Sequence, residues 1–249
     1  MKKKINFHFS VDDVLKSLIE VTDQNIKLTN HWFFSYLYKI YQTYNVKIAL
    51  YLFYEEKINN KIRNLTEVRN LKKELKENWI FFGAHALNYQ SPPHKLSVKI
   101  QKNHIDKIYK EIIRFTGKKY LAKKLRLHEY SECYELNKNL RKYNVSSLFT
   151  TDRNIGAYRL KEKNKKDLLT KGITKFKGQN FIRTDFRIEN MVKKKSTENI
   201  KSIKKILDRK NYLSIYSHEY ELNRKICRLN FLNLLNKITK IYSLKSNLP

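Results

Sequence analysis

Residues 5–14 read INFHFSVDDV, and this stretch decides the fold that we expect. Residues 5–10 alternate apolar and polar side chains, with Ile5, Phe7 and Phe9 on one face, which is the period of a β-strand. Two carboxylates, Asp12 and Asp13, follow directly. Adjacent carboxylates repel each other unless a cation or a shared proton compensates them, so the pair predicts a metal or acid–base centre at a strand end. The alternative is that one of them caps a following helix.

Stretches of strand and helical character alternate along the rest of the chain, which predicts an α/β fold. The 249 residues suit a single domain over residues 1–249. Lysine-rich residues 159–180 are expected to form an exposed excursion. Further strands are expected at 46–53, 79–85, 125–128, 146–150, 181–189 and 212–217, and helices at 30–44, 55–76, 101–115, 131–143, 196–210 and 221–244.

The chain is strongly basic, with 53 Lys and Arg against 23 Asp and Glu and a formal charge of +30. Such charge can bind nucleic-acid phosphates. Here the basic residues are spread along the chain, and a codon bias toward A and T would also enrich lysine, so nucleic acid is not the expected partner. The charge favours an anionic substrate by long-range steering. Cys133 and Cys227 lack metal-site spacing, and no secretory or membrane-spanning apolar run is evident, so we expect a cytoplasmic protein.

Four more strand ends carry side chains that can do chemistry. His85 ends the strand at 79–85, Arg126 and His128 share a face at 125–128, and His218 and Glu219 follow the strand at 212–217. In α/β barrels such strand ends surround the active site. Each could instead be structural: a hydrogen-bonded core histidine, a basic edge strand or a helix cap. The strand at 181–189 places four charged side chains on one face: Arg183, Asp185, Arg187 and Glu189. This row could line a site, or it could be a solvated ladder of salt bridges.

The order of these motifs resembles the polysaccharide deacetylase family (carbohydrate esterase family four) over about residues 5–220. Residues 9–14 (FSVDDV) are similar to the family's Thr-Phe-Asp-Asp-Gly motif, and residues 83–85 (GAH) to its metal-binding histidine motif. Residues 126–128 (RLH) occupy the place of its arginine motif, and residues 215–218 (IYSH) that of its closing Leu-x-His motif. The resemblance implies a distorted (β/α) barrel of about seven strands, which agrees with the strand count above.

The resemblance also implies a metal-dependent hydrolase that removes an acetyl group from a sugar. Asp12 would be the general base and His218 the general acid, with Arg126 orienting Asp12. Asp13 and His85 would bind a divalent metal, for which zinc is expected. The family's second metal-binding histidine is replaced by Tyr89. The third ligand is therefore left open between His94, His128 and a residue of another kind.

The remaining candidates concern the substrate and the partners. A cytoplasmic enzyme of surface-polysaccharide biosynthesis would act on a nucleotide sugar or a lipid-linked glycan, both of which carry phosphate. Motif departures leave an alternative, a catalytically inactive barrel that binds glycans or nucleic acid. An apolar stripe on the helix at 221–244 predicts packing on the barrel, with peripheral membrane contact as the alternative. Candidate substrate-binding residues are Asp152, Asp185, Arg187, Glu189 and Glu219.

Overall fold

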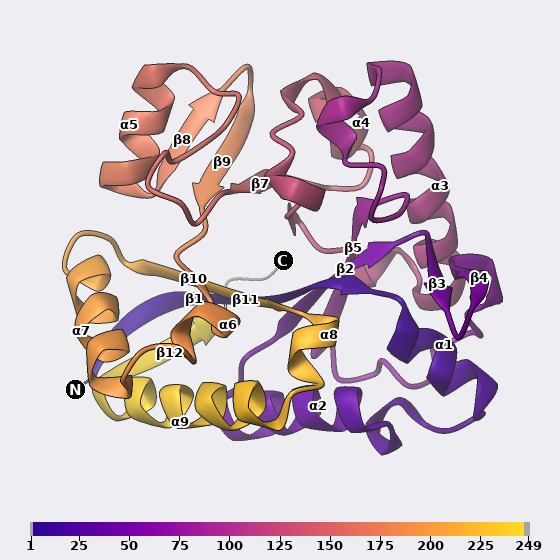
Figure 1. The fold of residues 1–249 in the computed structure, drawn as a ribbon, viewed down its shortest axis with the longest axis horizontal. Coiled ribbons are helices and arrows are strands. Elements are labelled where there is room, and N and C mark those ends of the chain that lie inside the picture. Colours follow the sequence, from indigo (N-terminus) through magenta and orange to yellow (C-terminus); the bar gives the residue numbers. More distant parts are fainter. Residues whose placement is uncertain (1, 247–249) are drawn as a thin grey trace.

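A parallel sheet forms the centre of the molecule in the computed structural model, which describes residues 2–246. Its strand order is β10-β11-β1-β2-β5, and β12 pairs with the first half of β1 (Figure 1). Strands β2 and β5 are buried along their whole length, and β1 is buried from Phe7 onward, as expected of a parallel sheet between layers. Their bounds are β1 (Lys3–Val14), β2 (Ile48–Phe53), β5 (Ile80–Ala86), β10 (Phe186–Arg187), β11 (Tyr212–His218) and β12 (Tyr242–Ser246).

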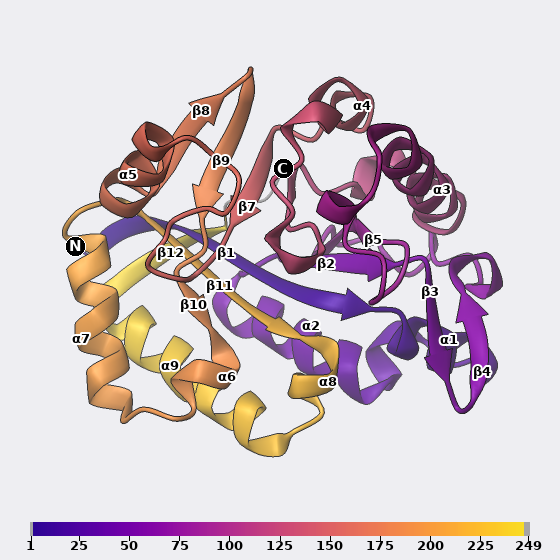
Figure 2. The same cartoon turned by 45° about the horizontal axis from the view of Figure 1, so that its top comes forward.

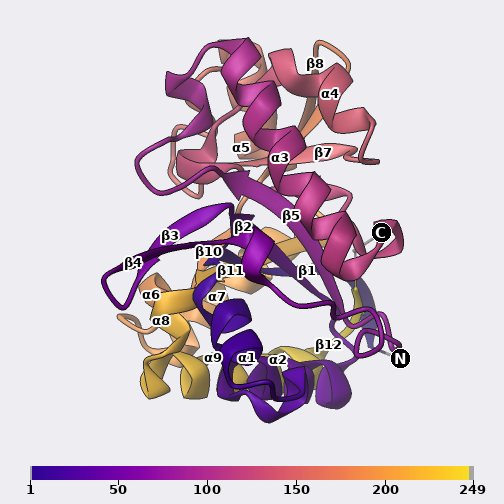
Figure 3. The ribbon, with the colours of Figure 1, turned by 90° about the vertical axis from the view of Figure 1, so that its right-hand side faces the viewer.

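A second sheet has the order β6-β7-β9-β8 and lies across the first (Figures 2 and 3). Its strands are β6 (Lys124–Leu125), β7 (Ser147–Thr150), β8 (Ile173–Phe176) and β9 (Gln179–Arg183). An isolated parallel bridge between Phe82 and Leu121 links β5 to the chain before β6, and β9 leads directly into β10 of the first sheet. The order is therefore that of a distorted barrel with interrupted ladders, which confirms the expected α/β class.

Helices cover the outside of the central sheet. α2 and α9 lie along one face in Figure 1, where Phe231 of α9 packs on Phe9 of β1 with ring centroids 4.5 Å apart. The apolar row of β1 thus faces helices, whereas Ser10 of the polar row contacts Arg126 beside β6, inside the barrel. The helices are α1 (Lys16–Asp23), α2 (Trp32–Tyr44), α3 (Val98–Thr116), α4 (Asn137–Arg141), α5 (Glu162–Lys171), α6 (Ile188–Met191), α7 (Ser196–Leu207), α8 (Glu219–Leu222) and α9 (Lys225–Ile241).

The helix expected at 55–76 is wrong. Residues 55–64 form a hairpin of β3 (Glu55–Ile58) and β4 (Lys61–Asn64), followed by a short 3₁₀ turn at Leu65–Glu67. The turn between the strands is Asn59-Asn60, with φ of 50° and 64°. Asparagine tolerates this left-handed conformation, which two-residue hairpin turns require, and this local chemistry overrides the charged pattern that suggested a helix.

Other expected elements differ in their bounds. The strand expected at 125–128 is the shorter β6, and the helix expected at 131–143 is a 3₁₀ turn at Tyr134–Leu136 followed by α4. The strand expected at 181–189 is broken into β9, β10 and α6, so its four charged side chains do not share one face. Residues 159–180, expected as an exposed excursion, contain α5, β8 and the start of β9.

The helix expected at 221–244 is α9, which ends at Ile241, where the chain enters β12. Within its apolar stripe, Leu235 and Ile238 are buried, whereas Ile226 and Leu229 are exposed. None of the helices in residues 2–246 is long and apolar enough to cross a membrane.

Candidate active site

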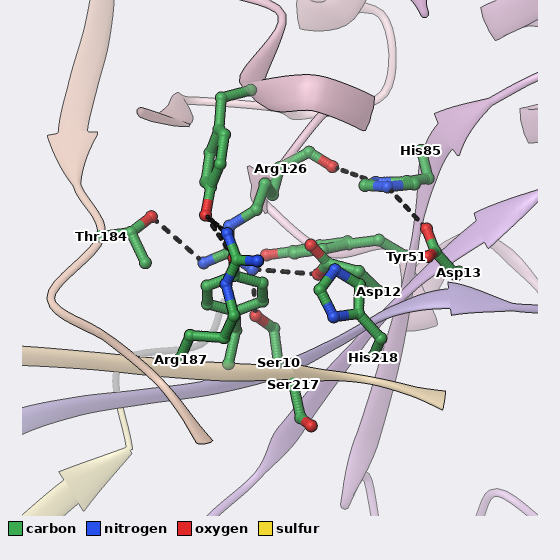
Figure 4. A network of polar contacts seen from close by, with 12 residues as sticks. Ser10, Asp12, Asp13, Tyr51, His85, Arg126, Thr184, Arg187, Ser217 and His218 are labelled. Carbon is green, nitrogen blue, oxygen red and sulfur yellow. Dashed lines mark hydrogen bonds and ion pairs between the residues drawn. The ribbon is translucent and has the colours of Figure 1, made fainter. Parts of the chain in front are cut away.

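The strand-end residues line one cavity of about 520 Å³ at the carboxyl ends of β1, β5 and β11. Figure 4 shows the polar network at its base. The cavity combines carboxylates, imidazoles, arginines and tyrosines, with little purely apolar lining. Its titratable residues are Asp12, Asp13, His85, Tyr89, His94, Arg126, His128, Glu129, Tyr130, Arg153, Tyr158, Arg159, Arg187, Tyr216, His218 and Tyr220.

A bulge in β1 brings two neighbouring carboxylates to the same cavity. The pairing of β1 with β2 is regular up to Val11, shifts register, and resumes at Val14. Within the bulge Asp13 has a φ of 60°, a left-handed conformation that costs a non-glycine residue free energy. In a regular strand Asp12 and Asp13 would point to opposite faces. The bulge re-aims Asp13, as β-bulges beside functional sites do.

Asp13, His85 and His128 form a compact cluster of potential metal ligands. Asp13 Oδ1 lies 3.1 Å from His85 Nε2 and 3.9 Å from His128 Nδ1, and the two imidazole nitrogens are 3.3 Å apart. Zinc bonds of about 2.0–2.2 Å in a tetrahedral site give ligand separations of roughly 3.3–3.5 Å. The three atoms therefore stand at separations close to those of three ligands around one ion.

The hydrogen bonds of the two histidines fix which nitrogen faces the cluster. His85 Nδ1 donates to the carbonyl oxygen of Arg126 at 2.6 Å, and His128 Nε2 donates to that of Tyr89 at 3.1 Å. In neutral imidazoles this leaves His85 Nε2 and His128 Nδ1 as lone pairs. Asp13 Oδ1 is buried and accepts no hydrogen bond. Three acceptors without a donor between them fit a bound cation, and backbone-anchored imidazoles are typical of metal sites.

The ionisation of the cluster agrees with this assignment. Burial would raise the pKa of Asp13, but the nearby imidazoles of His85, His218 and His128 hold that pKa below its usual value. Burial and the neighbouring His85 lower the pKa of His128 to about 4, against a weaker opposing pull from Asp13. A deprotonated carboxylate and a neutral imidazole are the forms that bind a metal.

Asp12 has very different surroundings. Arg126 Nη1 donates to Asp12 Oδ1 at 2.9 Å and to Ser10 Oγ at 2.8 Å, as Figure 4 shows. Arg126 is only 1% exposed, and its guanidinium lies 3.9 Å from the ring centroid of Tyr216. An arginine buried this deeply pairs with Asp12 and fixes the orientation of its carboxylate.

His218 lies beside Asp12, since these residues are partners in the parallel ladder between β1 and β11. Its Nδ1 donates to Glu189 Oε1 at 2.5 Å, which leaves Nε2 available on a cavity-lining side chain. Burial lowers the pKa of His218, but the Glu189 hydrogen bond and the charges of Asp12 and Asp13 outweigh it and raise the pKa above its usual value. His218 is thus arranged to hold a proton near neutral pH.

The structure places the other sequence candidates around this centre. His94 lines the cavity but lies outside the three-ligand cluster, with Nδ1 at 2.9 Å from Ser131 Oγ. Asp152 accepts a hydrogen bond from Tyr130, and Arg187 lines the cavity. Asp185 is not among the residues that line this cavity: it pairs with Lys210 at 2.7 Å and accepts from the backbone of Ser214.

Glu219 caps a helix that Asp12 and Asp13 were candidates to cap. It accepts from the backbone N–H groups of Leu15 and Ser17 at the start of α1, at 2.9 and 2.6 Å. Burial raises its pKa to about 7 despite these hydrogen bonds. Glu219 also lines a second cavity of about 560 Å³, which adjoins the first through Asp13, Tyr89 and Tyr220.

Several residues of the first cavity carry no sequence signal of their own that would have singled them out. Tyr130 donates to Asp152 and receives a hydrogen bond from Arg187 at 2.9 Å, yet it carries no charge and follows a short strand. Glu129 and Tyr130 both have φ of 51°, an uncommon turn that the sequence does not signal. Arg153 and Arg159 lie on the segment after β7 and are indistinguishable by pattern from other surface basic residues. Only the position just beyond a strand end could have singled them out.

Comparison with known proteins identifies the fold. No family model and no curated protein matches the chain. Among solved structures, 4-alpha-glucanotransferase from Thermococcus litoralis is similar with a TM-score of 0.58 and 14% identity, over 98% of this chain and 40% of that one. A BA3943 mutant, described as a CE4 family pseudoenzyme with restored enzymatic activity, is similar with a TM-score of 0.54 and 11% identity, over 99% of this chain and 67% of that one.

The chain therefore has a divergent polysaccharide-deacetylase-like fold, as the motif resemblance implied. It spans less than half the length of the glucanotransferase and about two thirds of the pseudoenzyme. The chitin deacetylase from the fungal pathogen Colletotrichum lindemuthianum is also similar, with a TM-score of 0.48, 12% identity and coverage of 98% of this chain and 87% of that one.

Proposed function

We propose that this protein is a metal-dependent hydrolase that removes an acetyl group from an amino sugar or a related glycan precursor. The observation that carries the proposal is the convergence of Asp13, His85 and His128 on one point, with no hydrogen-bond donor between their ligand atoms. Asp12 and His218, which line the same cavity, supply groups for proton transfer. A pure binding protein has no need of this combination.

Asp13 Oδ1, His85 Nε2 and His128 Nδ1 would hold the metal, and one carboxylate with two imidazoles is a donor set that suits zinc. A bound divalent ion would polarise the acetyl carbonyl and lower the pKa of a bound water. His128, one of the candidates named from the sequence, would be the third ligand.

The chain's own residues would perform the proton transfers. Asp12, held in place by Arg126, would accept the proton of the attacking water. His218, held by Glu189, would donate a proton to the leaving nitrogen. Ser10 accepts a hydrogen bond from the same Arg126 guanidinium and so restricts the orientation of that guanidinium. This assignment gives each of the two neighbouring carboxylates one task.

The finer parts of the proposal concern substrate and location. We propose a phosphate-bearing acetylated sugar, either a nucleotide sugar or a lipid-linked glycan, and a cytoplasmic reaction. The formal charge of +30 supports an anionic substrate. Membrane contact through α9 would use its exposed Ile226 and Leu229. Sedimentation with vesicles, comparing the wild type with Ile226→Ser/Leu229→Ser, tests that contact.

Metal content of the purified protein tests the proposal first. We expect one divalent ion per chain after incubation with zinc, and loss of that ion in Asp13→Asn and His85→Gln. His104→Gln is the matched control, because His104 on α3 lines neither cavity. Acetate release from N-acetylated sugars should fall by about 10³-fold in Asp13→Asn, since a catalytic metal stabilises the transition state by several kcal/mol.

Two results would count against the proposal. A wild-type protein that takes up no zinc, cobalt or nickel would leave an inactive barrel with a binding role. Stoichiometric metal without acetate release from any N- or O-acetylated sugar would retain the metal centre and reject deacetylation.

A further inference from the structure

Three arginines line the same cavity as the ligand cluster and are not used in the proposed reaction. Arg153, Arg159 and Arg187 contribute to its wall, together with Tyr130 and Tyr158. Arg187 lies at the end of β10, and the other two lie on the segment that follows β7. They come from two separate parts of the chain and face one cavity.

Their guanidinium groups are only weakly committed to carboxylates. Among the ion pairs of residues 2–246, Arg153 has none, Arg159 reaches Glu135 at 3.6 Å, and Arg187 reaches Asp152 at 3.5 Å. By contrast, Arg63 outside the cavity donates to Asp23 and Glu67 at 2.5–2.9 Å. The cavity arginines therefore keep donors available for a ligand, and the bidentate geometry of arginine suits carboxylate or phosphate.

The acidic residues of the cavity do not neutralise this wall. Of the described residues that line it, three are acidic. Asp12 is paired with Arg126, and Asp13 belongs to the ligand cluster. Glu129 lies 3.5 Å from Lys95. An excess of positive charge therefore faces the part of the cavity defined by Arg153, Arg159 and Arg187.

The segment that carries Arg153 and Arg159 is held in place. The side chain of Glu132, which is fully buried, accepts hydrogen bonds from the backbone N–H groups of Tyr158 and Arg159 at 2.9 and 2.6 Å. Gly156 turns the segment with a φ of 74°, and a side chain there would come within 2.9 Å of the Lys165 carbonyl oxygen on α5. A pre-ordered loop loses little conformational entropy when a ligand binds, as expected of a built site.

We propose that Arg153, Arg159 and Arg187 bind the phosphate groups of a sugar diphosphate while its acetyl group lies at the Asp13–His85–His128 cluster. This inference rests on the proposed function and assigns its substrate class to named residues. A diphosphate fits better than a lone carboxylate, because it offers several anionic oxygens to three separate guanidinium groups. A nucleotide sugar and a lipid-linked sugar diphosphate share this chemistry.

Equilibrium binding to the zinc-loaded protein tests the proposal, with the Asp12→Asn background used to prevent turnover. The probes are UDP-N-acetylglucosamine, a farnesyl-diphosphate-linked N-acetylglucosamine and the neutral methyl glycoside of N-acetylglucosamine. We expect at least one diphosphate to bind 10-fold or more tightly than the glycoside, and the preferred diphosphate identifies the carrier. Arg153→Gln and Arg159→Gln should each weaken that binding by about 10-fold, since hydrogen bonds to charged groups contribute on this scale.

Arg209→Gln is the control, because Arg209 is an exposed arginine of the chain that does not line this cavity. It should leave binding unchanged, and raising the salt concentration should weaken binding of the diphosphates alone. Equal affinity for the diphosphates and the glycoside, or unchanged binding in both arginine variants, would overturn the inference. Acetate release from the neutral glycoside in that case would leave the proposed function standing. Arginine-dependent diphosphate binding without any acetate release would support the inference about the three arginines and reject deacetylation.

Discussion

Asp12 and Asp13 are neighbours in sequence, both are buried, and both face the same cavity, yet their surroundings differ completely. Asp12 accepts a hydrogen bond from a buried arginine at 2.9 Å. Asp13 Oδ1 faces the lone pairs of two imidazoles and has no donor. The Asp12 side is complete within the chain, whereas the Asp13 side becomes electrostatically complete only with a cation.

This difference shows how one strand end can separate two functions. A bulge of a single strand sends Asp12 toward Arg126 and Asp13 toward His85. A carboxylate that already has a strong internal partner keeps its orientation whether or not a ligand is present. A carboxylate without one binds whatever positive charge the cavity admits. The free energy of unfolding of the metal-free protein should therefore depend mainly on the Asp12–Arg126 pair. Metal binding should depend mainly on Asp13.

Removing Arg126 should have the largest effect on stability. Arg126→Met leaves the charge of Asp12 buried without its partner, and we expect a loss of about 3–5 kcal/mol in the free energy of unfolding. Urea unfolding of the metal-free protein measures this loss. Arg63→Met is the control, because the Arg63 side chain is 22% exposed and its partners more so, and it should cost about 1 kcal/mol or less.

A second substitution tests whether the loss comes from the stranded charge. Arg126→Met/Asp12→Asn should recover most of the lost stability, since the buried negative charge is gone. If the double variant is as unstable as Arg126→Met, packing of the guanidinium against Tyr216 is the main contribution instead.

Glu189→Gln should have an intermediate effect, on activity and its pH dependence. Glu189 is the largest contribution that raises the pKa of His218, so its loss lowers that pKa. Protonated His218 then disappears at a lower pH, and the alkaline limb of kcat/KM against pH should move to lower pH. We also expect about a 10-fold lower maximum, as the imidazole loses its orienting partner.

Glu198→Gln provides the control for this comparison, because Glu198 is an exposed residue of the first turn of α7. An alkaline limb that stays in place in Glu189→Gln would show that His218 is not the group that must remain protonated.

The smallest effect is expected for His94→Gln. His94 lines the cavity, but its ring contacts Ser131 and, at 3.7 Å, the half-exposed Glu129. Partly exposed contacts of this kind contribute about 0–1 kcal/mol, so zinc affinity should change less than about fivefold. Competition with a chelator of known affinity measures it. A loss as large as that of His128→Gln would move the metal site toward the loop of His94.

The sequence predicted most of the architecture because strands and their ends carry strong local signals. The alternating row of β1 and the apolar runs of β2 and β5 were sufficient to expect an α/β fold, and parallel strand ends necessarily meet at one edge. Asp12, Asp13, His85, Arg126, His128 and His218 accordingly line one cavity. Their catalytic roles stay predictions until the variants above are measured.

The sequence could not predict features that depend on single backbone angles or on distant contacts. The choice between His94 and His128 depends on a turn in which Glu129 and Tyr130 adopt positive φ, and neither residue type signals it. The Asn59-Asn60 turn outweighed a charge pattern that resembled a helix. Glu219 lies 204 residues from Leu15, whose backbone it caps, so no local pattern could reveal that contact.

The position of β1 at the centre of the sheet has a consequence for biosynthesis. This strand pairs with β2 on one side and with β11 and β12 on the other. Asn6 meets Asn211, which the ribosome adds 205 residues later. At about 5–20 residues per second, β1 waits on the order of 10–40 s for β11, and longer for β12. During translation its apolar row of Ile5, Phe7 and Phe9 lacks the cover of α9, so this row can aggregate until the C-terminal part of the fold is made.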